Sequence, residues 1–318
     1  PTLQGRSVDL SHVLRGSAGQ HNVTLSLSGP MGRRLVSASR VFSVSTAPRG
    51  AVLLYHSHPL LVYKKKWIIK CLDSILAQST KEFDILELDY AAQGFSVLDF
   101  YLNATGTVNL PFGVEHIFLT EPLPNHARAA NLLAGLAFSR GYDHVFNVHL
   151  DDYYQTERFE RQAEALARGI NVVSGGFRYV RETGEGEDEI DWEVFDVSRL
   201  LHIDAGKDTS SGVCDEAQEE ALVQRLREGS NPIGNSALAL SRGMWLLEGG
   251  WACGGGEEGL FDDPPDEDLR LWQRCLVGGH ISAHILPYTL AYARRHQHQV
   301  SSVSQRESDE WHRASGIR

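Results

Sequence analysis

The sequence predicts an α/β fold with a mostly parallel, Rossmann-like sheet flanked by helices. Two observations support this prediction. From Ala51 onward, short apolar runs typical of buried strands alternate with segments of helical periodicity. Four such runs separated by helical segments favour parallel strands joined by right-handed crossovers. Residues 1–50 show a different pattern and are predicted to form a small N-terminal β appendage.

The appendage is predicted to be a β-hairpin. Apolar and polar residues alternate from Val23 onward, which is the period of a strand, and the Gly-Pro-Met-Gly turn at 29–32 separates two such runs. Pro48 and Gly50 then mark the boundary with a main domain that we expect to span 51–305.

The first half of the main domain is the more regular part. We expect strands at 51–55, 83–88, 114–119 and 145–150. We expect helices at 67–78 and 156–167, and a further helix that ends at Ala137.

In the second half, we expect strands at 171–177 and 281–285, a strand-like piece at 231–241, and helices at 216–227 and 269–277. The charge-rich segment 182–230 is either an insertion that forms a lid on the acceptor side or a mobile acidic surface loop. Residues 306–318 are predicted to be a polar tail.

The composition argues against two classes of partner. The 41 acidic residues outnumber the 30 Lys and Arg residues, and the net charge is −11. Nucleic acids and anionic membranes are bound through clustered cations, so neither is expected as a partner. No stretch approaches the roughly twenty apolar residues of a membrane span, and no basic-then-apolar leader is present. The chain begins at Pro1 rather than Met, which fits a processed or excised piece.

The four cysteines have no C-x-x-C spacing, which argues against a structural zinc site. Cys214 and Cys253 lie in predicted loops, and the sequence does not decide whether they form a disulfide. Glycosylation sequons begin at Asn22 and Asn103, and they matter only in a secretory lumen. Because such triplets also occur by chance, the localisation stays open between the cytoplasm and the secretory lumen.

Two adjacent carboxylates, Asp151 and Asp152, follow the apolar run 145–150 directly. Open α/β sheets hold their ligands at the carboxyl ends of parallel strands. Mg²⁺ and Mn²⁺ prefer oxygen ligands and are held by one or two carboxylates together with substrate phosphates. The pair therefore indicates a divalent cation that bridges a nucleoside diphosphate. The alternative is a solvated turn that caps the helix expected from Thr156.

Several pieces of the chain, taken in order, resemble one family. These pieces are CLDSILAQS, the strand ending at Asp89, NHARAAN, Asp151–Asp152, the glycine-rich loop 249–259, EDLRLWQR and RRHQHQVS. Together they resemble the family-two inverting glycosyltransferases of GT-A fold, over about residues 51–305. The resemblance implies transfer of a sugar from a nucleotide-diphosphate donor to a hydroxyl of a glycan or glycoprotein acceptor, with Mn²⁺ or Mg²⁺ as cofactor.

The resemblance also implies the roles of individual residues. It assigns nucleotide binding to Tyr55, Ser57, Asp89, Arg128, Asn131, Asp151 and Arg295. It assigns the metal to Asp152, Asp151, His296 and His298, and the general base to Asp268, with Glu267 beside it.

The chemistry of sugar transfer requires two separate acidic groups. A cation held by carboxylates neutralises the diphosphate leaving group and orients the anomeric carbon. The acceptor hydroxyl has a high pKa, so it needs a carboxylate within hydrogen-bond reach to take its proton. The acidic pair at 151–152 and the acidic pair at 267–268 meet this requirement.

Two departures from the family pattern affect these assignments. His149 stands where the family usually has an acidic residue, and residues 89–93 replace an Asp-rich turn. Uridine, guanosine and thymidine donors all stay open. For single residues, the structural alternatives are a turn cap for Asp89, a surface cation for Arg128 and a favourable helix-dipole contact for Asp268.

The alternative function is a noncatalytic carbohydrate- or nucleotide-binding domain that retains the fold, as His149 suggests. A sugar-nucleotide pyrophosphorylase is disfavoured, because residues 56–59 offer no glycine-rich phosphate loop with Arg or Lys.

Overall fold

The computed structural model of the protein describes residues 19–28, 34–44, 49–107, 110–182, 187–189, 216–228, 233–251, 267–277 and 282–294. The chain divides into two compact units, Pro1–Arg49 and Gly50–Arg318. Among the described helices, none has both the length and the apolar character needed to cross a bilayer.

The first unit contains the predicted hairpin. Strand β1 (Gly19–Ser28) pairs in antiparallel register with β2 (Arg34–Val44), and the ladder is irregular between Leu27 and Ser28. The turn expected at 29–32 lies outside the described residues.

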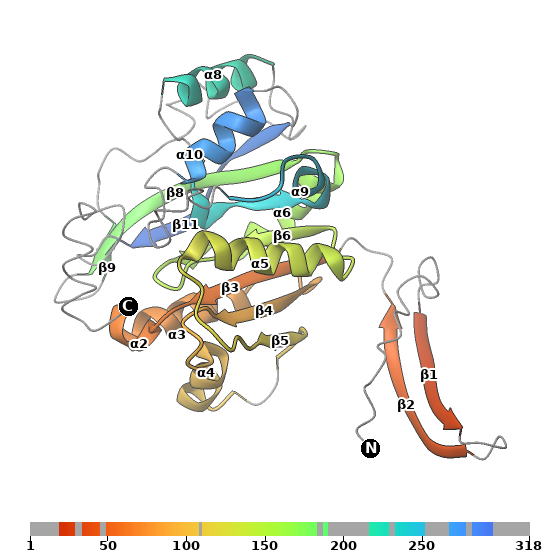
Figure 1. The fold of residues 1–318 in the computed structure, drawn as a ribbon. Helices are drawn as coiled ribbons and strands as arrows, with labels where there is room; N and C mark the ends of the chain where they lie inside the picture. Colours follow the sequence, from red (N-terminus) through yellow and green to blue (C-terminus); the bar gives the residue numbers. More distant parts are fainter. Residues whose placement is uncertain are drawn as a thin grey trace. The chain divides into compact units, whose positions relative to one another are not determined.

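The second unit is built on a nine-stranded sheet. Its strands are β3 (Gly50–His56), β4 (Phe83–Asp89), β5 (Val114–Ile117), β6 (His144–Asn147), β7 (Tyr153–Tyr154), β8 (Val172–Glu182), β9 (Glu187–Glu189), β10 (Ala239–Ser241) and β11 (Ala283–Arg294). They lie in the order β5-β4-β3-β6-β10-β8-β11-β7, with β9 paired to β8. Figure 1 shows β5, β4, β3 and β6 next to one another in this order. Strands β3 to β6 are parallel, β8 and β11 are parallel, and β10 is antiparallel to both of its neighbours.

Helices flank this sheet. They are α2 (Pro59–Val62), α3 (Lys65–Leu76), α4 (Val97–Thr105), α5 (His126–Ser139), α6 (Arg158–Ala167), α8 (Glu216–Arg227), α9 (Arg242–Glu248), α10 (Glu267–Trp272), a 3₁₀ turn η2 (Asn235–Ala237) and a π turn η3 (Gln273–Val277). One buried cluster joins one face of β3 and β4 to α5, α8, α9 and α10. The other cluster joins the opposite face to α3, α4 and α6.

The burial of both faces explains why β3 is a nearly continuous apolar run. Leu53 packs into the cluster with α5 and Leu54 into the cluster with α3, and neither has exposed surface. Strands buried on both faces are typical of parallel sheets covered by helices, as α5 covers β3 and β4 in Figure 1. The predicted fold class, a mostly parallel sheet flanked by helices with an N-terminal β appendage, is confirmed.

Several elements differ from the expectations. Helix α4 was not predicted, β11 continues to Arg294 beyond the expected strand end, and β6 ends at Asn147 rather than at residue 150. In addition, Leu222 and Leu226 of α8 are buried in the cluster that contains α5. That part of the segment 182–230 therefore contributes to the core.

Candidate functional site

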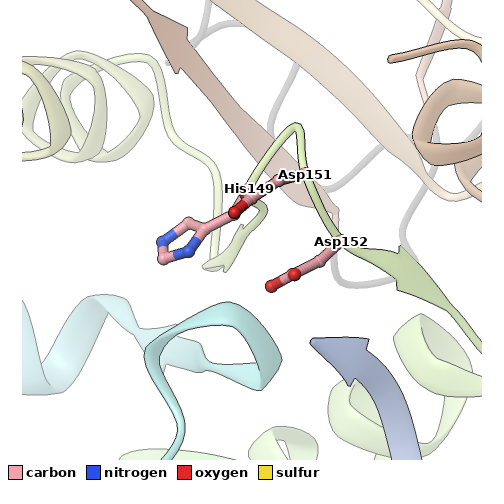
Figure 2. A group of neighbouring side chains, drawn as sticks. All are labelled: His149, Asp151 and Asp152. Atoms are coloured by element: carbon pink, nitrogen blue, oxygen red, sulfur yellow. The ribbon is translucent and has the colours of Figure 1, made fainter. Parts of the chain in front are cut away.

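The acidic pair lies in a tight turn that follows β6, at the carboxyl end of a strand parallel to β3. His149, Asp151 and Asp152 each offer one ligand atom, and these atoms lie within 4.8 Å of one another. Figure 2 shows the three side chains projecting from the turn toward a common region. Asp151 and Asp152 are buried, being 7% and 3% exposed, which separates this cluster from the acidic groups that commonly lie on a protein surface.

Hydrogen bonds from neighbouring elements explain why the chain leaves the sheet before the acidic pair. The Asn147 side-chain amide donates to the main-chain and side-chain oxygens of Asn235, at 3.0 and 2.9 Å. The Tyr154 hydroxyl accepts from the His149 amide at 2.7 Å and donates to the His149 carbonyl at 3.1 Å. The Cys71 thiol donates to the same carbonyl at 3.4 Å. The main chain of His149 is thus held on both sides.

Strand β11 supports the acidic pair from the other side. The Arg294 amide donates to Asp152 Oδ1 at 2.9 Å, and its Nε donates to the Asp151 carbonyl at 2.9 Å. The Arg294 side chain is fully buried and its guanidinium lies 4.8 Å from the centre of the Trp67 ring. Ser236 of η2 also donates a hydrogen bond to Asp152. These contacts fix the direction of the carboxylate.

The electrostatics of the turn favour binding of a cation. Burial and the neighbouring Asp151 charge raise the pKa of Asp152 well above its usual value, against the hydrogen bonds from Arg294 and Ser236. Burial lowers the pKa of His149 to about 4, so its imidazole is neutral at neutral pH and has a lone pair for a ligand. Two buried carboxylates that repel each other, beside a neutral imidazole, form a donor set that a divalent cation fits.

The predicted nucleotide-binding residues of β3 and β4 lie on neighbouring strand ends. Tyr55 is the second-last residue of β3, and Ser57 comes directly after this strand. His56, between them, is paired with Asp89 of β4 in the parallel register. Tyr63 is the residue directly after α2. Burial and the charges of Asp151 and Asp152, together with Tyr90 and Tyr55, raise the pKa of its hydroxyl.

Asp89 holds its own loop. Its Oδ1 accepts from the Ala91 amide at 3.0 Å, and its Oδ2 accepts from the Gln93 and Phe95 amides at 2.8 and 3.2 Å. These bonds match the turn cap that was the alternative for this residue. Its role in nucleotide binding stays a prediction.

The two predicted residues of α5 differ in their surroundings. Arg128 is exposed, and its amide is capped by the Asn125 side chain at 3.0 Å. The Asn131 amide group instead forms two hydrogen bonds with the Trp251 main chain, donating to its carbonyl at 2.9 Å and accepting from its amide at 2.8 Å. Asn131 thus connects α5 to the main chain at Trp251.

Asp268 is the second residue of α10 and is partly buried. Leu271 and Trp272, further along the same helix, are fully buried in the cluster that contains α5. Glu267 begins α10. Arg295, His296 and His298 lie outside the described residues, and so do Cys214 and Cys253.

The sequence interpretation missed several supporting residues. His149 was noted as a departure, but its ligand atom lies with those of the acidic pair. A metal-ligating residue type two positions before an Asp-Asp pair was the signal that could have identified it. Arg294, Ser236 and Tyr154 gave no such signal, because each reaches the turn from another element.

The fold and the acidic turn define a Rossmann-like α/β protein with a candidate cation site. Neither a family model nor a curated protein matches the chain. Among solved structures, the chain is similar to S. aureus TarS. A complex of TarS 1–349 with UDP-GlcNAc has a TM-score of 0.48 and 12% identity, over 85% of this chain and 66% of that chain. A complex of TarS 1–349 with UDP has a TM-score of 0.47 and 13% identity, over 78% of this chain and 60% of that chain. The chain therefore spans about 60–66% of the length of these two structures.

Proposed function

We propose that the protein is a metal-dependent inverting glycosyltransferase that moves a sugar from a nucleotide-diphosphate donor to a hydroxyl of a glycan or glycoprotein. The observation that supports this most directly is the cluster of His149 with the two buried carboxylates Asp151 and Asp152 at the carboxyl end of β6. Ligands of α/β sheets bind at such strand ends. The ordered sequence resemblance over about residues 51–305 supports the same function.

His149, Asp151 and Asp152 would hold the cation. Carboxylates suit both Mg²⁺ and Mn²⁺, whereas an imidazole donor suits transition metals, so Mn²⁺ is the preferred ion of the two. A bound divalent cation would neutralise the charge that develops on the diphosphate leaving group.

The remaining roles fall on this chain's own residues. Tyr55 and Ser57, at the end of β3, would contact the nucleotide, and Arg128 would supply a cation near its phosphates. The acceptor oxygen bonds to the anomeric carbon as the bond to the diphosphate oxygen breaks, and the hydroxyl proton passes to an Asp268 carboxylate oxygen. Attack from the side opposite the leaving group inverts the anomeric configuration.

A thermal-shift experiment tests the proposal. We expect a nucleoside diphosphate with Mn²⁺ to raise Tm more than either component alone. A ligand at about 100 times its Kd stabilises the native state by about 2.7 kcal/mol, so the shift is large enough to measure. Asp152→Asn should lose this shift. Asp268→Asn should keep the shift and lose sugar transfer, which separates binding from chemistry.

Asp84→Asn is the matched control, because Asp84 is also buried but lies near the start of β4, where it accepts from the Gly113 amide at 2.9 Å. It should retain the shift. A shift that chelator leaves unchanged would contradict the metal assignment. Hydrolysis of a donor sugar nucleotide without acceptor separates the enzyme from a noncatalytic binding domain, which produces none.

A further inference from the structure

The loop that joins β4 to α4, residues 90–96, is held by two buried carboxylates of β4. Glu87 and Asp89 are two positions apart on the strand, so their side chains share one face of the sheet. They are 2% and 7% exposed. The loop itself reaches solvent at Gln93 and Gly94.

Asp89 binds the first part of the loop. Its two oxygens accept from three main-chain amides, those of Ala91, Gln93 and Phe95, at 2.8–3.2 Å. A carboxylate has about four lone-pair positions, so three of them are already used within the protein. A side chain that is 7% exposed and bonded in this way offers little to a ligand.

Glu87 binds the last part of the loop and two neighbouring strands. It accepts from the Val97 amide at 2.5 Å and from the Ser96 hydroxyl at 2.9 Å. His56 at the end of β3 lies 3.1 Å away, and His116 of β5 lies 2.9 Å away. One buried carboxylate therefore connects the ends of three adjacent strands with the start of α4.

The loop needs this support because two of its residues have left-handed main-chain conformations. Ala92 has a φ of 55° and Gly94 has a φ of 72°. For Ala92 this conformation is unfavourable by roughly 1–2 kcal/mol. The amides that donate to Asp89 belong to residues 91, 93 and 95, which lie on either side of Ala92 and of Gly94. The carboxylate therefore fixes the strained segment from both sides.

The place of the loop gives it a role in binding. The loop follows β4 at the carboxyl edge of the parallel strands, beside the end of β3. The Tyr90 amide donates to the His56 carbonyl at 2.9 Å, and the Leu123 amide donates to the Tyr90 carbonyl at 2.8 Å. The loop is thus a preformed part of the edge where ligands of this fold bind.

We propose that Glu87 and Asp89 are a pair of positioning residues that preform the loop 90–96, so that the loop, and not the Asp89 carboxylate, contacts the base of a nucleoside diphosphate. The second half of this statement rests on the proposed function, while the positioning of the loop can be measured in the protein alone. The role assigned to Asp89 by the sequence resemblance is thereby changed from direct contact to positioning.

The test compares Glu87→Gln and Asp89→Asn with the wild type and with Asp84→Asn, the buried carboxylate near the other end of the same strand. Hydrogen–deuterium exchange is followed in peptides covering 90–97 without nucleotide. UDP, GDP, dTDP and ADP are then titrated calorimetrically with Mn²⁺ present, and both Kd and stoichiometry are recorded.

Both loop variants should exchange faster in 90–97, whereas Asp84→Asn should match the wild type there. Loss of hydrogen bonds to a charged group should raise Kd by about tenfold or more for every nucleotide that the wild type binds, with the rank order of the bases unchanged. Stoichiometry should stay at the wild-type value, because a merely structural role would lower the competent fraction instead.

Wild-type exchange in 90–97 of both variants would overturn the positioning role. A change in the rank order of the bases caused by Asp89→Asn would overturn the indirect role and restore direct contact. If the wild type binds none of the four nucleotides, the proposed function fails, and the exchange measurement still decides whether the carboxylates position the loop.

Discussion

The main-chain amide of Arg294 donates a hydrogen bond to Asp152 Oδ1 at 2.9 Å, across 142 positions of the sequence. The end of β11 therefore fixes the carboxylate that the candidate cation site depends on. Because an amide donates this bond, substitution of the Arg294 side chain leaves it in place and removes only the contacts of the guanidinium. The contribution of the amide hydrogen bond can therefore be measured separately from the contribution of the guanidinium.

Asp152→Asn should stabilise the protein in the absence of ligands. Burial and the adjacent Asp151 charge raise the pKa of Asp152, so its ionised form is unfavourable in the native state at neutral pH. An asparagine removes that charge and still accepts from the Arg294 amide. We expect Tm to rise without ligand, while the shift caused by Mn²⁺ with a nucleoside diphosphate disappears. An unchanged or lower Tm would show that the buried charge is already compensated.

Arg294→Lys should lower the free energy of unfolding by about 1.5–3 kcal/mol, the usual contribution of a hydrogen bond made by a charged group. The lysine keeps a charge but loses the Nε bond to the Asp151 carbonyl and the contact of the guanidinium with the Trp67 ring. Urea denaturation measures the change. Arg161→Lys is the control, since Arg161 also lies over an aromatic ring, that of Tyr288, but at the surface. Its effect should stay below about 1 kcal/mol, as for exposed ion pairs.

Asn131→Ala should lower Tm by the same amount with and without nucleotide. The substitution removes both hydrogen bonds to the Trp251 main chain, and leaving those groups unsatisfied costs about 1–3 kcal/mol. Differential scanning calorimetry with and without UDP and Mn²⁺ measures both values. A normal Tm combined with a smaller nucleotide-induced shift would instead assign Asn131 to nucleotide binding, as the resemblance implies.

Glu87→Gln should weaken the acid dependence of stability. Burial raises the pKa of Glu87, but hydrogen bonds from His116, His56 and the Val97 amide outweigh it, and the pKa falls to about 2. A carboxyl with a depressed pKa stabilises the native state above its unfolded pKa of about 4.5. This stabilisation is lost as the pH falls toward 2.

The shift corresponds to a loss on the order of 3 kcal/mol over that range, which the variant should not show. At higher pH the sign reverses. The hydrogen bond to Glu87 raises the pKa of His116, so stability from this pair is complete below pH 6.5 and is lost as the pH rises through the raised value. Urea titrations of both proteins between pH 2 and 9 measure the difference, and parallel curves would contradict it.

The regular first half of the sheet could be predicted from the sequence, because strands buried on both faces are rich in apolar residues. Helix α4 was missed although it carries a start signal, since the Ser96 side chain accepts from the Asp99 amide at 2.9 Å. The expected end of β11 was too early. Pro287 interrupts the pattern, and the structure continues the strand past it with irregular register between Leu286 and Thr289.

The candidate site could be predicted only where its residues are close in sequence. The Asp151–Asp152 pair was visible as an abrupt change from apolar to acidic residues. Its partners Ser236 and Arg294 come from η2 and β11, and no local pattern connects them to the turn. Asn131 shows a different limit. The resemblance assigns this residue to nucleotide binding, but the sequence does not reveal that its side chain bonds to the Trp251 main chain.

The position of β11 in the sequence also has a consequence for how the candidate cation site forms during folding. Strands β3 to β6 are complete by Asn147, and β11 reaches the acidic turn only at the end of the described chain. Contacts between residues so distant in sequence form late and slowly, because the closure of a long loop must precede them. In refolding experiments, we therefore expect most helical signal to return before affinity for Mn²⁺ does.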